Sequence, residues 1–199
     1  MPADELYRLL RSYDPSDVSM QWFYAAWVEN LSVEDAVAVL NGDPATGAPD
    51  SFAGWGSGSD GSDDEAGGML AGPIGGWTLV IGDYRVTEDE AVLALSRRGG
   101  RALAVCWDTG SQTQVKYAKS GELLTVLDIL FTDDRSGSEP DALVPYMDGL
   151  RFDIDGEPPV EPAESFTSAL TLIGRMTGRP IDREWLEATH VAYAVPAEV

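Results

Sequence analysis

Two residue types that often act as a catalytic base or nucleophile occur once each in the sequence: the histidine His190 and the cysteine Cys106. A Ser–His or Cys–His nucleophile would need His190 as its base, and a zinc site with two histidines cannot form. His190 lies in a short Thr-His-Val-Ala-Tyr run, which is typical of a packed or surface histidine. Cys106 stands between Val105 and Trp107, where a cysteine usually behaves as a small buried apolar residue. We therefore predict no catalytic residue.

Cofactor and metal motifs are either absent or out of context. Residues 56–61 fit G-x-G-x-x-G, but no strand pattern precedes them and no helix pattern follows. The carboxylates of residues 60–65 would repel a pyrophosphate, and they lack the spaced ligands, central glycine and distal glutamate of a calcium loop. The sequence contains no P-loop, nucleophile-elbow or metalloprotease signature. We predict no cofactor, no metal and no enzymatic activity.

The charge of the chain is strongly one-sided. It contains 34 acidic and 13 basic residues, which leaves a formal net charge of −21. This charge repels nucleic acid phosphates and anionic lipids, so we expect no nucleic acid or membrane partner. Between Arg11 and Arg85 there is no lysine or arginine. The negative electrostatic field of this stretch is typical of a solubilising surface, and it would also attract a basic partner.

A small group of cations offers an alternative function. Arg97 and Arg101 flank a Gly-Gly pair at a predicted helix end, where cations complement the helix dipole. Joined by Lys116 from a neighbouring strand, beneath Trp77 and Trp107, they would hold a small molecule or an anion in a concave pocket. The sequence leaves the structural and the ligand-binding explanation open.

The first third of the chain is predicted to form two helices. Within residues 18–30, the apolar side chains have the spacing of one helical stripe: Trp22, Phe23, Ala26 and Trp27. Ser32 and Asp35 form a capping pattern for a second, short helix that ends near Leu40. Residues 42–75 are rich in glycine, serine and acid, which predicts a flexible acidic loop.

The rest of the chain alternates between strand and helix patterns. A β-branched run predicts a strand at 76–82, and a capping box that starts at Thr87 predicts the helix after it. The further predicted elements are strands at 102–107, 114–118 and 123–127, helices at 140–150, 164–176 and 182–188, and a last strand at 190–195. We predict a single α+β domain over residues 1–199, in which a small, mainly antiparallel sheet of about four to five strands packs against N- and C-terminal helices.

Several of these motifs resemble an uncharacterised family of small acidic actinobacterial α+β proteins, known only as a domain of unknown function. The matching motifs are Gly76-Trp77-Thr78-Leu79-Val80, the helix end Leu95-Ser96-Arg97, and Gly100-Arg101-Ala102 before Val105-Cys106-Trp107. The resemblance implies a small α+β fold and transfers no catalytic residue. Members look like products of multi-copy, lineage-specific genes, and immunity proteins share this feature.

Together these observations favour a cytoplasmic, non-enzymatic binding or regulatory protein, with immunity as one form of that role. It would capture a basic protein partner through its acidic surface, and salt would weaken the binding. The candidate contacts are Glu34, Asp35, Asp60, Asp63, Asp64 and Glu65. The alternative is a small-molecule or anion-binding domain that uses Arg97, Arg101 and Lys116.

Overall fold

The centre of the protein is one open antiparallel sheet. A computed structural model describes residues 4–13, 22–56, 68–109 and 112–196. Its strands are β1 (Phe23–Glu29), β2 (Ala48–Asp50), β3 (Gly68–Ile74), β4 (Trp77–Ile81), β5 (Arg101–Trp107), β6 (Thr113–Lys119), β7 (Glu122–Asp128), β8 (Arg135–Ser136) and β9 (His190–Ala194). In the described ranges these nine strands are ordered β2-β9-β3-β4-β1-β5-β6-β7-β8, and each pairs with its neighbours in the antiparallel sense.

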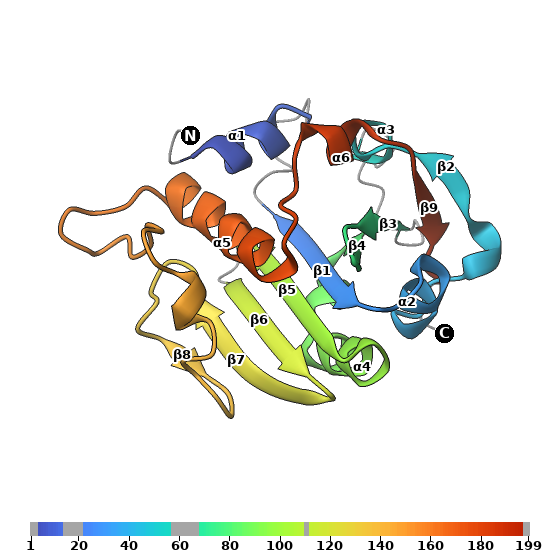
Figure 1. Cartoon of the computed structure of the whole chain (residues 1–199). Coiled ribbons are helices and arrows are strands. Elements are labelled where there is room, and N and C mark those ends of the chain that lie inside the picture. The colour runs from blue at the N-terminus through green and yellow to red at the C-terminus, as the bar shows by residue number, and fades with distance from the viewer. Residues whose placement is uncertain (1–3, 14–21, 57–67, 110–111, 197–199) are drawn as a thin grey trace.

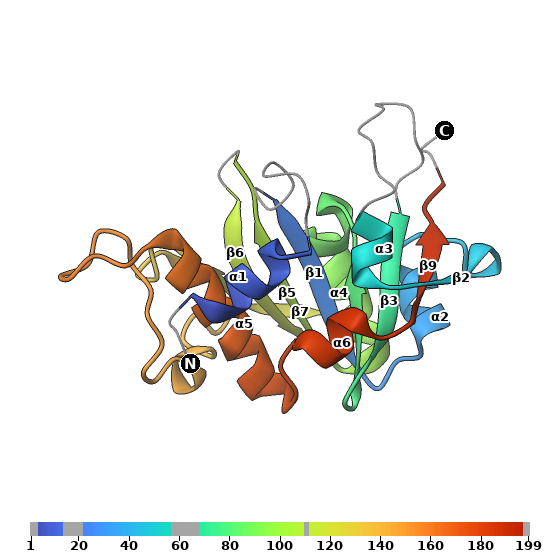
Figure 2. The same ribbon diagram turned by 90° about the horizontal axis from the view of Figure 1, so that it is seen from above.

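Helices cover both faces of this sheet. Among the residues that the structure describes they are α1 (Glu5–Arg11), α2 (Val33–Val39), α3 (Phe52–Gly56), α4 (Asp89–Gly99), α5 (Pro162–Thr177) and α6 (Arg183–Glu187), together with the short 3-10 turns η2 (Pro44–Thr46), η3 (Tyr84–Thr87) and η4 (Val144–Tyr146). Helices α1, α5 and α6 lie on one face (Figures 1 and 2). Helices α2 and α4 pack on the other, against β3 to β6.

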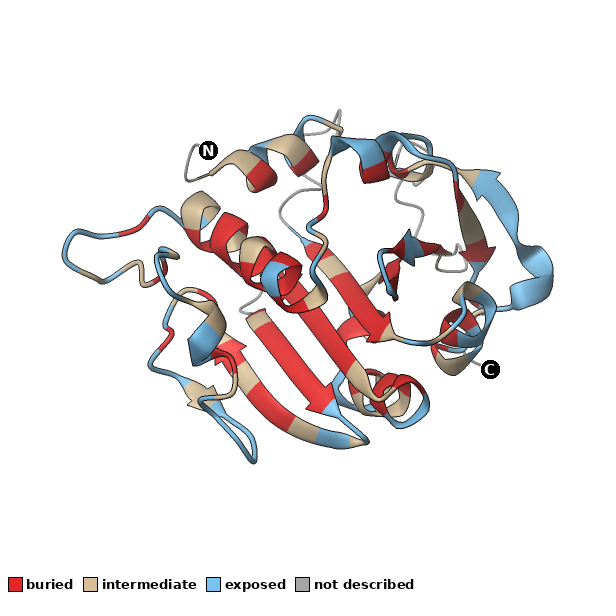
Figure 3. Ribbon diagram, in the orientation of Figure 1, coloured by how far each residue is buried: buried red, intermediate tan, exposed pale blue. Residues whose placement is uncertain are grey.

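Each face of the sheet has its own apolar core. Along β1, Trp27 belongs to the core beneath α1, α5 and α6, whereas Val28 belongs to the core beneath α2 and α4. Strand residues alternate between the faces, so a strand that is covered on both sides is apolar at almost every position. Figure 3 shows the result as continuous buried stretches along β5 and β6. We call these faces the α5 face and the α4 face.

The prediction of a small sheet of four to five strands is wrong. The largest single error is the predicted helix at 18–30, where the structure has the central strand β1. An uninterrupted apolar run fits a helical stripe and a doubly covered strand equally well, because neither pattern needs polar positions in between. Ala26 and Trp27, assigned to one helical stripe, in fact point to opposite faces of the sheet.

The prediction of a loop over 42–75 is wrong for the part that the structure describes. This interval contains β2, α3 and β3, and β3 joins β9 to β4. Its glycine and proline content hid the strand, since both residues are rare in strands. Pro73 pairs with Thr78 of β4, but the pairing of β3 with β9 ends at Ala71. The missing N–H of Pro73 is therefore tolerated, because β3 is an edge strand at this position. Residues 57–67 lie outside the described ranges.

Most of the remaining predicted elements are present in the structure. The strand β4, the meander β5–β6–β7, the helices α2, α4, α5 and α6 and the strand β9 are confirmed. The capping box at Thr87 is wrong, because α4 is capped by Glu88 without a side-chain hydrogen bond and the Thr87 hydroxyl donates to the Tyr84 carbonyl. The helix predicted at 140–150 is only the 3-10 turn η4.

The contact between Gly72 and His190 gives a direct test of how β3 and β9 pack. A Cβ at Gly72 would lie 2.1 Å from Nδ1 of His190. Gly72→Ala should therefore lower the free energy of unfolding by about 1–3 kcal/mol through overpacking. In a His190→Ala background the same substitution should cost much less, because the obstructing ring is gone. Urea unfolding of the four proteins measures this, and an unchanged cost in the double mutant would contradict the packing.

Candidate functional site

A groove of about 540 Å³ opens on the α4 face, between the end of α2 and the start of α4. The segment after β9 forms a third side. The lining residues are Val39, Leu40 and Asn41 from α2, Arg85, Glu88, Glu90, Ala91 and Ala94 from η3 and α4, and Val195 and Pro196 after β9. The groove therefore combines segments that are far apart in the sequence.

The floor and the rim of the groove differ in chemistry. Its floor is apolar, since Leu40 and Val195 are buried and Ala91 and Ala94 are partly buried. Its rim carries Glu88 and Glu90, which are exposed and form no ion pair with the described residues. A pocket of this kind fits a group with an apolar stem and a cationic end.

Local structure explains why the carboxylates gather at this point. Glu88, Asp89 and Glu90 occupy the cap and the first turn of α4, where negative charge complements the helix dipole. Asp89 is bound by Lys116, with 2.6 Å between Nζ and Oδ1. Arg85, in the same groove, is held by Asp83, with 3.0 Å between Nε and Oδ1. The ion pairs therefore leave Glu88 and Glu90 as the acidic groups of the rim.

The predicted partner-binding residues are only partly described. Glu34 and Asp35 lie exposed on the first turn of α2, at the other end of the helix from the groove. The Ser32 hydroxyl oxygen accepts the Asp35 N–H and caps the helix, as predicted. The remaining candidates, Asp60, Asp63, Asp64 and Glu65, lie outside the described residues.

The three cations of the alternative site are not brought together. Arg101 lies on the α5 face, where Glu29 binds it and its guanidinium lies 5.1 Å from the centre of the Trp77 ring. Lys116 lies on the opposite face, bound to Asp89, and Arg97 is exposed on α4 with its stem over Gly121. Arg101 and Lys116 stand on neighbouring strands, but the alternation of faces points them to opposite sides of the sheet.

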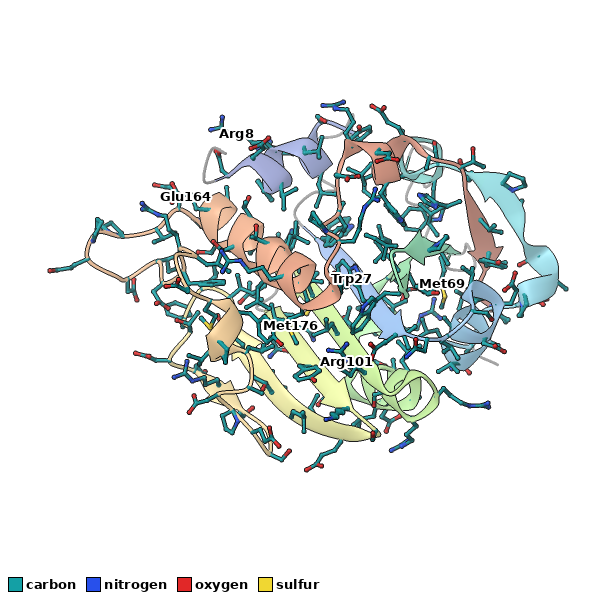
Figure 4. The ribbon with its side chains drawn as sticks, viewed as in Figure 1. Arg8, Trp27, Met69, Arg101, Glu164 and Met176 are labelled. Carbon is teal, nitrogen blue, oxygen red and sulfur yellow. The ribbon has the colours of Figure 1, made fainter. Side chains whose placement is uncertain are left out.

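Arg101 and Glu29 form a half-buried, two-pronged ion pair. The guanidinium donates from Nε to Oε2 at 2.7 Å and from Nη2 to Oε1 at 2.6 Å. These hydrogen bonds lower the pKa of the Glu29 carboxyl, and they raise the pKa of Arg101. Figure 4 labels Arg101 at the start of β5. The pair therefore ties the end of β1 to the start of β5.

His190 and Cys106 are both used in packing. Nε2 of His190 lies 2.6 Å from the Trp185 carbonyl oxygen, and its ring stacks on the Trp185 ring at 4.0 Å. Its buried Nδ1 has no hydrogen-bond partner among the described residues. Cys106 is buried and shares the α4 face with Ala104, two residues before it on β5, and this burial raises the pKa of its thiol. Neither side chain activates the other, because they lie on different strands and faces.

Sequence reasoning did not find the groove. Its two rim carboxylates were visible in the Thr-Glu-Asp-Glu run, but a helix start explained that run completely. The apolar floor comes from α2, α4 and the segment after β9, and no short-range pattern shows that these segments meet. The local signal was the acidity of this run, which predicts a helix start as readily as the edge of a binding site.

The described part of the chain defines an α+β protein in which helices cover both faces of one open antiparallel sheet. The chain belongs to a family of unknown function, DUF6461, whose model matches residues 10–198. The resemblance to a domain-of-unknown-function family is thereby confirmed. No curated protein and no solved structure matches the chain.

Neither a metal-binding cluster nor a membrane-spanning helix occurs among the described residues. Within the described ranges, no group of three or more His, Cys, Asp or Glu side chains is arranged to hold a metal ion. None of the helices that the structure describes has the length and apolar character needed to cross a membrane.

The Glu29–Arg101 pair predicts a defined pH dependence of stability. The pKa of Glu29 is lowered in the folded protein. Its contribution to the free energy of unfolding is therefore fully present above the ordinary glutamate pKa of about 4.3, and it is lost as the pH falls through the lowered value. Glu29→Gln should lower the free energy of unfolding by about 1–2 kcal/mol near neutral pH and by progressively less in acid.

Urea unfolding at several pH values measures this difference between Glu29→Gln and the parent protein. Glu122→Gln is a suitable control, since Glu122 is exposed and forms no ion pair with the described residues. A cost of Glu29→Gln that stays constant into acid would show that the ion pair does not stabilise the fold.

Proposed function

We propose that this chain is a non-enzymatic binding protein that captures a basic protein partner through the acidic surface of α2 and α4. The groove between these helices is the observation that carries the proposal. Its apolar floor suits the aliphatic stem of a lysine or arginine, and the carboxylates of Glu88 and Glu90 suit the charged end.

The charge of the whole molecule supports the same proposal. A net charge of −21 creates a negative potential that raises the rate of encounter with cationic surfaces and repels anionic ones. Glu34 and Asp35 extend the acidic surface along α2 and away from the groove. A partner that fills the groove would therefore meet further carboxylates at its margin.

The non-enzymatic part of the proposal is supported by the use of the two most reactive residue types. His190 packs against Trp185 and Gly72, and Cys106 is a buried thiol with a raised pKa. Both side chains are buried in the packed interior. Immunity is one form of the proposed function, in which the basic partner would be a toxin.

Binding of a defined cationic peptide tests the proposal. The probe is a fluorescent peptide of alternating arginine and alanine, with a glutamate-for-arginine peptide as its counterpart. We expect the arginine peptide to bind at low salt and to lose about ten-fold or more in affinity at high salt, whereas the glutamate peptide should not bind. Fluorescence anisotropy measures both affinities.

Matched charge variants locate the site. The double substitution Glu88→Gln and Glu90→Gln should lower the affinity for the arginine peptide about ten-fold, since two direct cation contacts are removed. The control replaces the exposed Asp155 with Asn and Glu157 with Gln, which changes the net charge equally outside the groove. Equal losses from both pairs would mean that only total charge matters, and the groove would be excluded as the site.

A further inference from the structure

Three large aromatic side chains are exposed at the same end of the sheet. Trp22 is 46% exposed, Tyr84 53% and Phe131 45%. They come from the residue before β1, from η3 and from the segment after β7. Aromatic residues of this size usually lie buried in cores or interfaces, so such a group calls for an explanation.

Strand register brings the three aromatics to one end. Phe23 pairs with Trp107, and Ala25 pairs with Ile81, so β1 starts where β4 and β5 finish. Likewise, β6 starts where β7 finishes, because Gln114 pairs with Asp128. Four strand spacings separate β4 from β7, which gives a row about 19 Å long. We call this row the aromatic rim.

Hydrogen bonds hold the Phe131 part of the rim in place. One carboxylate oxygen of Asp128 accepts the N–H groups of Leu130 and Phe131, at 2.8 and 2.9 Å. Asp153 accepts the N–H of Thr132 at 2.6 Å and binds its hydroxyl as well. The exposed ring therefore stands on a fixed turn, and little conformational entropy would be lost when a partner covers it.

The Tyr84 part of the rim is held in a similar way. Asp83 accepts the N–H of Arg85 at 3.0 Å and so caps η3, the turn that carries Tyr84. Arg85 and Glu88 also line the groove between α2 and α4. The aromatic rim and the groove therefore belong to one continuous surface that meets at η3.

Carboxylates accompany the aromatic rim. Asp133 and Asp134 follow Phe131, are exposed, and form no ion pair with the described residues. Asp108 lies at the end of β5, where it accepts the Tyr24 hydroxyl at 3.0 Å. Burial and this hydrogen bond raise the pKa of Tyr24. Carboxylates therefore lie beside the Trp22 and Phe131 parts of the rim, and the electrostatic complement of this surface is basic.

We propose that the basic partner docks across the aromatic rim as well as into the groove, with Trp22, Tyr84 and Phe131 as the energetic centre of the interface. This inference rests on the proposed function and specifies the partner as a folded protein with a basic surface broad enough to cover the row. Tyrosine and tryptophan dominate binding energy at interfaces, while surrounding charges set orientation and rate. A second copy of this chain is a poor occupant, since two bodies of charge −21 repel each other.

Site-specific photo-crosslinking in cells that naturally express the protein tests this proposal. Residues 22, 84 and 131 are replaced one at a time with p-benzoylphenylalanine. Val144 in η4 is the control position, because it is 42% exposed and its neighbours Ala142 and Tyr146 line a hollow beside the β6–β7 turn, at the opposite end of these strands. We expect one basic protein to be cross-linked from all three rim positions and not from residue 144.

The partner identified in this way then allows binding to be measured with the purified proteins. Trp22→Ala and Tyr84→Ala should each weaken binding about ten- to thirty-fold, whereas Val144→Ala should change it less than about two-fold. Circular dichroism and urea unfolding confirm that the variants remain folded.

The outcomes separate this inference from the proposed function. If the Glu88 and Glu90 variant weakens binding while the rim variants do not, the aromatic rim is not the docking surface and the charge-based function stands. A shared adduct of twice the chain mass would show self-association and overturn the inference. The absence of an adduct shared by the three positions would overturn it as well.

Discussion

The burial of one nine-stranded sheet on both faces is the constraint on which the rest of the described structure depends. Trp27 and Leu79 fill the core beneath α5, while Val28 and Val80 fill the core beneath α4. With both faces committed to packing, charged groups can sit only on outer helix surfaces, at sheet ends, or in ion pairs. The acidic residues are therefore mostly exposed, on helix starts such as that of α4, at strand ends and in connecting segments.

The same constraint decides what the cations do. Arg101 and Lys116 belong to neighbouring strands but point to opposite faces, and each is bound by a carboxylate. Their positive charges connect elements of the fold and do not converge on an anion. Glu88 and Glu90, in contrast, remain without an ion pair among the described residues, beside an apolar floor. This asymmetry between bound cations and accessible carboxylates leads to the proposal of a basic partner.

Sequence patterns predicted the elements whose signals are local. Apolar spacing, glycine stops and alternation located α4, α5 and the meander β5–β7. They failed for β1, because its two-sided burial removes the polar positions that distinguish a strand from a helix, and for β3, because its Gly72 and Pro73 suggest a loop. The groove needed the contact between α2 and α4 across some fifty residues, which no short-range pattern contains. The charge of its rim could be predicted, but its location could not.

Hydrogen–deuterium exchange of the whole chain, with and without the arginine peptide, is the most direct test of the central claim that α2 and α4 form the capturing surface. Bound peptide should slow amide exchange in residues 33–41 and 84–94 and leave α1 and α5 unchanged. Slower exchange confined to α1 and α5, with none at α2 and α4, would show that the basic ligand binds elsewhere and would contradict the account.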